Sequence, residues 1–400
     1  MTTDIILYII TCVSFFLLAF ISFFNPLKIN IVANKWFGLF LFSVGCMLLN
    51  FIIYSVKAEA AYTRLIAFGE LSRFAMAPAL YLSVLHYTSP DKAFKSKDYL
   101  HFIPFMVFFI YVVPNVIAPQ FRFGELTILP AVVNRFIPVL LSTAIKIQLF
   151  IYWVLAYRKL DQHQKNIQLI ASSTGPVNLQ WLRLLLLGIA FLICLWFNTL
   201  FFKIQLIESF STLGYLTGVL FICYFLLAQK EIYPYNTGEL NQIELVIKEE
   251  KTTTPRFSED ILLQLKEKLA KLMDAEKPYL ENELSLPQLA AAMNISSHDL
   301  SYLLNEGFGK NFFQFINSYR VEEAKQLLLS EKHKQLNILG IAYSAGFNSK
   351  TTFNTSFKKE TGLSPSKFVQ QFKENSAAAA LNSTQQTCSD GYNRTTEPLS

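Results

Sequence analysis

Charged residues are scarce in this chain of 400 residues: 16% are Asp, Glu, Lys or Arg, whereas 52% are hydrophobic. With a mean hydropathy of +0.33, this composition excludes an ordinary soluble protein. Cysteine is also rare, and the 5 cysteines are spaced neither as a disulfide framework nor as a zinc site. The sequence lacks a nucleotide-binding loop, a nucleophile motif and a cluster of His, Cys and Asp residues. We therefore expect no enzyme, no cofactor and no bound metal.

Hydrophobic runs fill the first 228 residues of the chain. A helix that crosses a bilayer needs about 20 apolar residues. Spans of that kind are expected at 5–24, 36–55, 64–86, 99–118, 132–156, 181–202 and 209–228. Asp4 precedes the first run and no basic residue does, so we expect no cleavable signal peptide. Residues 1–228 are therefore predicted to form a seven-helix transmembrane bundle with a sensor-like role.

Basic residues are unevenly divided between the loops that join these spans. If the N-terminus lies outside, the outer loops carry only Lys57, Arg122 and Lys203. The inner loops then carry Lys28, Lys35, Lys92, Lys95, Lys97, Arg158, Lys159 and Lys165. Because cytoplasmic loops are enriched in Lys and Arg, we expect a multi-pass protein of the bacterial inner membrane whose residues from 229 onward lie in the cytoplasm. The polar residues 159–179 are predicted to form an exposed cytoplasmic connection.

Ionisable side chains within the spans indicate what the membrane half does. Glu70 and Arg73 lie on one face of the third span, close enough to pair, and Lys146 lies in the fifth. Charges at such depth are costly and usually face a polar interior. Two interpretations stay open at this point: a cavity that senses a signal, or an ion pair that holds the spans together.

The chain beyond the spans divides into three parts. Residues 229–257 contain two proline-bearing breaks and are predicted to be a cytoplasmic linker. An amphipathic helix is predicted to begin at Ser258, as the start of a domain over 258–373; its apolar face either dimerises the protein or packs on the rest of that domain. The tail 374–400 has no core-forming pattern and is predicted to be disordered.

A helix-turn-helix pattern occurs twice in this domain. The motif needs a small residue where two short helices cross, and then a turn residue that tolerates positive φ. The two copies supply these residues as Ala290 with Asn294, and Ala342 with Gly346. Between the copies, residues 312–329 are predicted to form one uninterrupted helix. A single motif of this kind is weak evidence, but a duplicated one with a joining helix is specific.

Two stretches carry a family likeness. The joining helix reads Phe312-Phe-Gln-Phe-Ile-Asn-Ser-Tyr-Arg320, and the second copy closes with Thr361-Gly-Leu-Ser-Pro365. Over roughly residues 265–373 the chain closely resembles the DNA-binding domain of the AraC/XylS family of bacterial transcription regulators. The resemblance implies two helix-turn-helix subdomains whose recognition helices, at about 297–305 and 349–360, enter successive major grooves. The chain departs from the family in having Tyr302 where a basic residue is frequent, and membrane spans where the sensor is usually soluble.

Side chains on the free faces of the two recognition helices are the candidate base contacts. They are His298, Ser301, Tyr302 and Asn305 in the first helix, and Lys350, Thr351, Asn354, Thr355 and Lys358 in the second. Asn can bond adenine bidentately, Thr can contact a thymine methyl, and Lys can reach guanine. Three lysines are candidate phosphate contacts: Lys310, Lys359 and Lys367. Such contacts position the protein on the duplex but do not distinguish one base sequence from another. Each lysine is otherwise a solvated surface charge, and Arg320 is either a structural residue or a phosphate contact.

These observations predict an all-α, membrane-anchored, sequence-specific DNA-binding transcription regulator that responds to an unidentified signal. The alternative is a membrane transporter or channel with a regulatory cytoplasmic domain, although the sequence has no repeated halves or paired broken helices. The expected partners are double-stranded promoter DNA, the lipid bilayer, RNA polymerase and a second copy of the chain. The sequence names no ligand.

Overall fold

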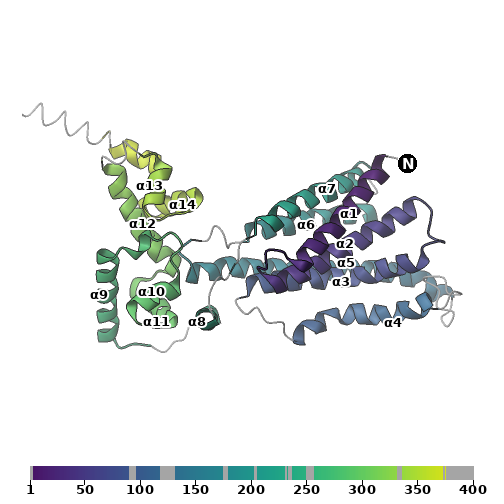
Figure 1. The fold of residues 1–400 in the computed structure, drawn as a ribbon, viewed down its shortest axis with the longest axis horizontal. Coiled ribbons are helices and arrows are strands. Elements are labelled where there is room, and N and C mark those ends of the chain that lie inside the picture. The colour runs from purple at the N-terminus through teal and green to yellow at the C-terminus, as the bar shows by residue number, and fades with distance from the viewer. Residues whose placement is uncertain are drawn as a thin grey trace, which may run out of the picture. The chain divides into compact units, whose positions relative to one another are not determined.

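The computed structural model describes residues 3–89, 96–117, 131–173, 179–201, 205–229, 232, 237–248, 256–330, 336–372 and 374. Apart from one isolated β-bridge, every regular element in these ranges is a helix, so the all-α prediction is confirmed for them (Figure 1). The chain divides into an N-terminal unit (Met1–Lys165 with Pro176–Leu240) and a C-terminal unit (Asn166–Gly175 with Asn241–Ser400). The predicted disordered tail lies outside the described residues, except for Glu374.

The N-terminal unit holds a helix at the position of each predicted span. They are α1 (Thr3–Phe24), α2 (Ile31–Ser55), α3 (Thr63–Thr88), α4 (Ile103–Ile117), preceded by the 3-10 helix η1 (Ser96–Phe102), α5 (Ala131–Ile170), α6 (Gln180–Phe201) and α7 (Gln205–Leu227). Four of these, α1, α2, α3 and α5, contain described stretches long and apolar enough to cross a membrane. The described parts of α6 and α7 have shorter apolar stretches, Gln180–Cys194 and Leu213–Leu227. A span count of seven therefore stays a prediction.

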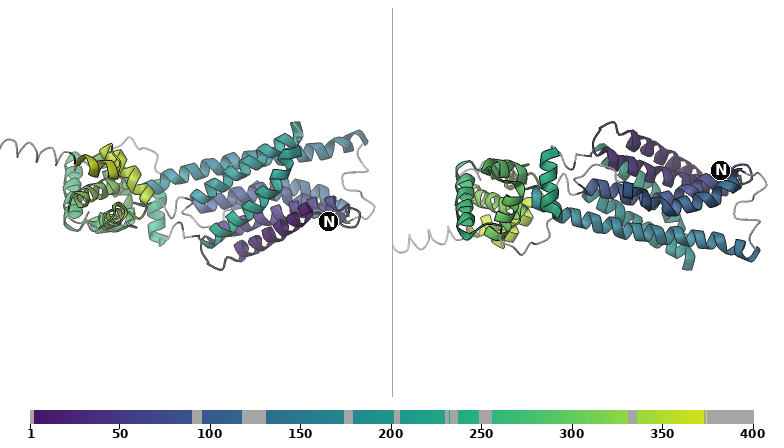
Figure 2. Two further views of the ribbon diagram at one scale, coloured as in Figure 1. Left: turned by 90° about the horizontal axis from the view of Figure 1, so that it is seen from above. Right: turned by 90° about the horizontal axis from the view of Figure 1, so that it is seen from below.

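The helices of this unit pack side by side, and α2 contacts both α1 and α3 (Figure 2). Outward-facing side chains of α1 are apolar: Val13, Leu17 and Phe20 are 61%, 58% and 60% exposed. Inward positions hold fully buried residues such as Phe37 and Leu41 of α2. In water a continuous exposed apolar face would favour aggregation, whereas in a bilayer lipid tails cover it.

Helix α5 is longer than its predicted span. The span was predicted to end at residue 156, followed by an exposed connection at 159–179, but the helix continues without a break to Ile170. The prediction of a loop there is wrong, because Leu160, Ile167 and Ile170 recur at helical spacing and are all buried. Polar residues between them give the stretch a loop-like composition. The last turn of α5 belongs to the C-terminal unit.

The C-terminal unit is built from short helices. They are α8 (Thr237–Lys248), α9 (Glu259–Ala275), η2 (Pro278–Leu280), α10 (Leu286–Met293), α11 (Ser297–Tyr302), the π-helical turn η3 (Leu303–Gly307), α12 (Phe312–Leu329), α13 (Ile338–Ser344) and α14 (Lys350–Thr361). The amphipathic helix α9 begins after Ser258, as predicted. Its residues Leu269 and Met273 are fully buried, and it packs on η2, α10 and η3. The interpretation that this face packs on the following domain is therefore confirmed.

Candidate nucleic-acid interface

The first helix-turn-helix consists of α10 and α11. Asn294, between the two helices, has the left-handed backbone (φ 54, ψ 43) that the turn requires. Ala290 is 1% exposed and lets the two helices approach closely. The Ser296 hydroxyl caps α11 by accepting a hydrogen bond from the backbone N–H of Asp299 at 3.0 Å. Ala290 and Asn294 therefore have the roles that the sequence spacing predicted.

The second helix-turn-helix, α13 and α14, repeats this geometry. Gly346 occupies the turn with φ 88, and Ala342 is fully buried at the helix crossing. Behind α14, the rings of Phe353 and Phe357 pack edge to face, as do those of Phe347 and Phe353. The resulting core holds α14 with its opposite side turned to solvent.

Helix α12 joins the two motifs over the predicted residues. It begins with a capping box in which Asn311 and Gln314 exchange hydrogen bonds between side chain and backbone. Phe312, Phe315 and Ile316 are buried on its inner face. It contacts both α13 and α14, and therefore positions the second motif.

Arg320 of α12 is fully buried, which excludes a phosphate contact in this structure. Its Nε donates to the carbonyl oxygen of Tyr279 and its Nη2 to that of Glu281, both at 2.7 Å. Its Nη1 donates to the backbone oxygen of Ser172 at 3.2 Å. Burial lowers the pKa of Arg320 to about 10, and the nearby Glu281 opposes that shift, so the guanidinium stays charged at neutral pH. Of the two interpretations of Arg320, the structural one is correct.

Sequence analysis missed the third partner of this arginine, the segment that follows α5. The backbone N–H of Ser172 donates to the carbonyl oxygen of Leu284 at 3.2 Å. The Asn317 side chain donates to the carbonyl oxygen of Ser172 at 3.1 Å, and the Ser173 hydroxyl donates to the Asn348 side chain. Ser172 is fully buried. The segment therefore contacts the approach to α10, the joining helix α12 and the turn before α14.

The reading face of α14, which is the side predicted to contact bases, is exposed to solvent. Its predicted base-facing residues are all exposed: Lys350, Thr351, Asn354, Thr355 and Lys358. The predicted phosphate contacts Lys359 and Lys367 are exposed as well. The third, Lys310, lies 3.8 Å from the carboxylate of Glu360 and would have to leave it to reach DNA. Contact of these residues with DNA stays a prediction.

The reading face of α11 is not open. Ser301 is only 8% exposed, so the prediction that its side chain is free is wrong. The π-helical turn that follows α11 gives a different face from the one expected for a continuous α-helix. Arg256 lies against His298, with its Nη1 3.1 Å from the His298 Nε2, and its backbone N–H donates to the Tyr302 hydroxyl at 3.1 Å. Asn305 is exposed.

Within the N-terminal unit, two of the three candidate sensing residues come together. The Arg73 Nη1 lies 2.9 Å from the Glu70 Oε2, and the amide of Asn50, on α2, donates to the other oxygen of Glu70 at 3.2 Å. Lys146 makes no ion pair with either of them among the described residues. Asn50 is fully buried and was missed, because a lone Asn in an apolar run gives no sequence signal.

A second buried polar network lies at the end of α7. Gln229 donates to the Tyr87 hydroxyl at 2.8 Å and accepts from the Asn34 side chain at 3.0 Å. The Tyr87 hydroxyl in turn donates to Asn34. Asn34 lies on α2 and Tyr87 on α3, so the residues that follow α7 are bonded to both helices.

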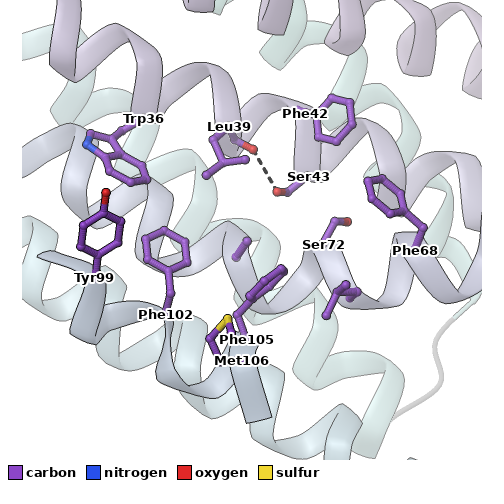
Figure 3. Close-up of a pocket in the computed structure, with 12 residues that line it drawn as sticks. Trp36, Leu39, Phe42, Ser43, Phe68, Ser72, Tyr99, Phe102, Phe105 and Met106 are labelled. Atoms are coloured by element: carbon purple, nitrogen blue, oxygen red, sulfur yellow. Dashed lines mark hydrogen bonds between the residues drawn. The ribbon is translucent and has the colours of Figure 1, made fainter. Parts of the chain in front are cut away.

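An apolar cavity of about 370 Å³ lies between α2, α3, η1 and α4 (Figure 3). Half of its lining residues are aromatic: Trp36, Phe42, Phe68, Tyr99, Phe102 and Phe105. The hydroxyls of Ser43 and Ser72 bond to carbonyl oxygens of their own helices, at 2.9 and 2.7 Å. A cavity with such walls suits an apolar group rather than a polar ligand.

Comparison with known proteins places a known domain over this interface. Residues 289–371 match the family model described as a helix-turn-helix domain, of the AraC type. The match covers α11, α12, α13 and α14 and most of α10, and does not extend to the N-terminal unit. The chain thus carries a helix-turn-helix domain over these residues.

Two curated proteins are similar to part of the chain. The uncharacterized HTH-type transcriptional regulator YijO of Escherichia coli (strain K12) is 30% identical over 105 residues, which are 25% of this chain and 36% of that protein. The regulatory protein PocR of Salmonella typhimurium is 27% identical over 114 residues, which are 28% of this chain and 37% of that protein. The chain therefore spans little more than a third of either relative.

A solved structure of a protein of unknown function from Listeria innocua is also similar. It is 30% identical, and the match covers 25% of this chain and 92% of that one, with a TM-score of 0.23. A TM-score this low carries no argument about fold.

Proposed function

We propose that this protein is a membrane-anchored, sequence-specific DNA-binding transcription regulator that responds to a signal through its N-terminal unit. The observation that carries the proposal is the pair of helix-turn-helix motifs with a polar, basic and exposed face on α14. The matching domain and the two regulator relatives support DNA binding. The apolar helices α1, α2, α3 and α5 support membrane anchoring. The contact with RNA polymerase and the homodimer stay predictions.

Substitutions in and next to the recognition helices test this function. Full-length protein should enrich one sequence from a library of randomised duplexes. Asn354→Ala, on the open face of α14, should then weaken binding to that duplex by about 1–3 kcal/mol and relax one base position. Lys359→Ala should weaken binding to enriched and scrambled duplexes alike, and reduce the salt slope by about one. Titrations at several salt concentrations separate the two effects.

Lys271→Ala is the control for these titrations, because Lys271 is an exposed lysine of α9 and lies on neither recognition helix. It should leave base preference unchanged. If the folded protein enriches no sequence at any salt concentration, the regulator function is wrong. The transporter or channel alternative then takes its place, and solute uptake into vesicles that contain the reconstituted chain would test it.

The proposal places the N-terminus outside the bacterial inner membrane and the C-terminal unit in the cytoplasm. The excess of Lys and Arg in the inner loops supports this orientation. A reporter fused after Ala228 should therefore behave as cytoplasmic, and one fused after Lys57 as external. Alkaline phosphatase and fluorescent-protein fusions at the two positions measure this. Export of the reporter at 228 would contradict the topology and separate the domain from DNA.

Two connections support passage of a signal from the N-terminal to the C-terminal unit. Helix α5 is continuous with the segment that bonds Arg320 and Asn317. The end of α7 is bonded to Asn34 and Tyr87 through Gln229, shortly before the chain enters the linker.

Glu70 and Arg73 are the proposed sensing residues, with the structural ion pair as the alternative. If they sense, Glu70→Gln should change the transcriptional response to growth conditions while the amount of protein in the membrane stays the same. The Glu70 side chain accepts from Asn50 with one oxygen and from Arg73 with the other. A glutamine at this position has one side-chain oxygen, so it keeps one of these two contacts. A transcriptional reporter, normalised to protein level by immunoblot, measures this. Loss of protein with normal output per molecule would favour the structural ion pair.

A further inference from the structure

The two recognition helices differ in how far they are exposed. The face of α14 is open, whereas that of α11 is covered by part of α8 and by the two residues Arg256 and Phe257, all within the C-terminal unit from Asn241 onward. Arg256 binds α11 from the outside: its Nε lies 2.8 Å from the Asp299 Oδ1, and its Nη1 3.1 Å from the His298 Nε2. The next residue, Phe257, packs its ring edge to face on Tyr302, with centroids 5.6 Å apart. His298 and Tyr302, two predicted base contacts, are therefore both occupied.

A second contact covers the N-terminal end of α11. Gln242 of α8 accepts hydrogen bonds from the backbone N–H of Ser297 at 3.3 Å and from its hydroxyl at 2.7 Å. Ile243 and Val246 of α8 are 0% and 4% exposed, so this helix is packed rather than solvated. In helix-turn-helix proteins the N-terminal residues of the recognition helix contact base edges. A helix packed at this end would prevent α11 from entering the major groove.

We infer that residues 242–248 of α8, together with Arg256 and Phe257, form an autoinhibitory strap that covers the first recognition helix and must leave α11 before both motifs can enter DNA. The inference rests on the proposed function, since it assumes that α11 and α14 read successive major grooves. The strap follows the last helix of the N-terminal unit, so a change in that unit has a direct route to it. In the covered state only α14 is available to DNA.

The contacts of the strap with α11 are weak enough for the strap to dissociate from that helix. Asp299 and Arg256 are 27% and 37% exposed, so their attraction is partly screened. Burial raises the pKa of Asp299, but the Ser296 hydroxyl and Arg256 lower it by more, so the carboxylate is charged at neutral pH. Loss of the ion pair and the aromatic contact should shift the balance between covered and open states by about fivefold to twentyfold.

The test is the double variant Arg256→Ala/Phe257→Ala of the full-length chain, in detergent or nanodiscs. The probe is the duplex that the wild-type chain enriches from a randomised library. The double variant should bind this duplex about five to twenty times more tightly, because a larger fraction of molecules is competent. A footprint that covers one major groove with the wild type should extend to the next groove. Lys271→Ala, which also removes one positive charge, should give neither change.

Gln242→Ala is the second variant, and it acts at the other end of α11. It should give a smaller gain in the same direction, and it keeps the test decisive if the double variant does not fold. A fall in affinity, like that expected of Lys359→Ala, would overturn the inference and make Arg256 a DNA contact. An unchanged affinity and footprint would overturn it too, and both results leave the proposed function standing. If the wild type enriches no duplex, the proposed function fails, and the inference with it.

Discussion

Replacing Arg320 with leucine is expected to lower the free energy of unfolding of the C-terminal unit by about 3–5 kcal/mol. The guanidinium is fully buried and serves the carbonyl oxygens of Tyr279, Glu281 and Ser172. Leucine would leave these acceptors without that donor in a place that water does not reach. Because Ser172 follows α5, the variant should also loosen the segment after that helix. Hydrogen exchange of α12 and of residues 166–173 in the full-length chain measures both effects.

Lys325→Leu is the matched control, on the same helix. Its ammonium pairs with Glu322 at 2.7 Å, and the Glu322 side chain is 60% exposed. An exposed pair of this kind contributes at most about 1 kcal/mol, so exchange should change little. Equal destabilisation by both substitutions would show that the polar contacts of Arg320 carry no special stability.

The second large effect is expected at Gly346. This residue has φ 88, and a Cβ there would collide with the carbonyl oxygen of Tyr279 and lie 2.9 Å from the Cα of Leu280. Gly346→Ala should therefore cost about 2–4 kcal/mol, the sum of left-handed strain and a clash with backbone that cannot turn aside. The turn of the second motif would move away from η2, and DNA binding should fall with it. Thermal unfolding of the full-length chain, together with binding to the enriched duplex, measures this.

Gly362 offers a control with the same backbone conformation but free space. Its φ is 77, and a Cβ there would meet no atom within 4 Å. Gly362→Ala should cost only the left-handed strain, about 1–2 kcal/mol. The difference between the two variants isolates the close approach of Gly346 to η2. If both variants lose the same stability, that approach is not what requires glycine at 346.

The amino-acid sequence by itself determined the elements whose signals are local. The joining helix spans Phe312–Leu329 as predicted, because a capping box opens it and apolar residues recur at helical spacing along it. Asn294 and Gly346 occupy the left-handed turns that their positions in the two motifs required. The positions of the helices in the first 228 residues could also be predicted, since long apolar runs mark them in the sequence.

Only the tertiary structure decided the contacts between distant parts of the chain. Arg320 is bonded to Ser172, 148 positions away, and Arg256 to Asp299, 43 positions away. No periodicity or spacing encodes such pairs, because each partner reads locally as an ordinary polar residue. The same holds for α5, which continues through a polar stretch in which Ile167 and Ile170 are buried. Which polar groups face DNA, and which are buried or covered, depends on the free energy of burial in the folded chain, and that is a property of the packed whole.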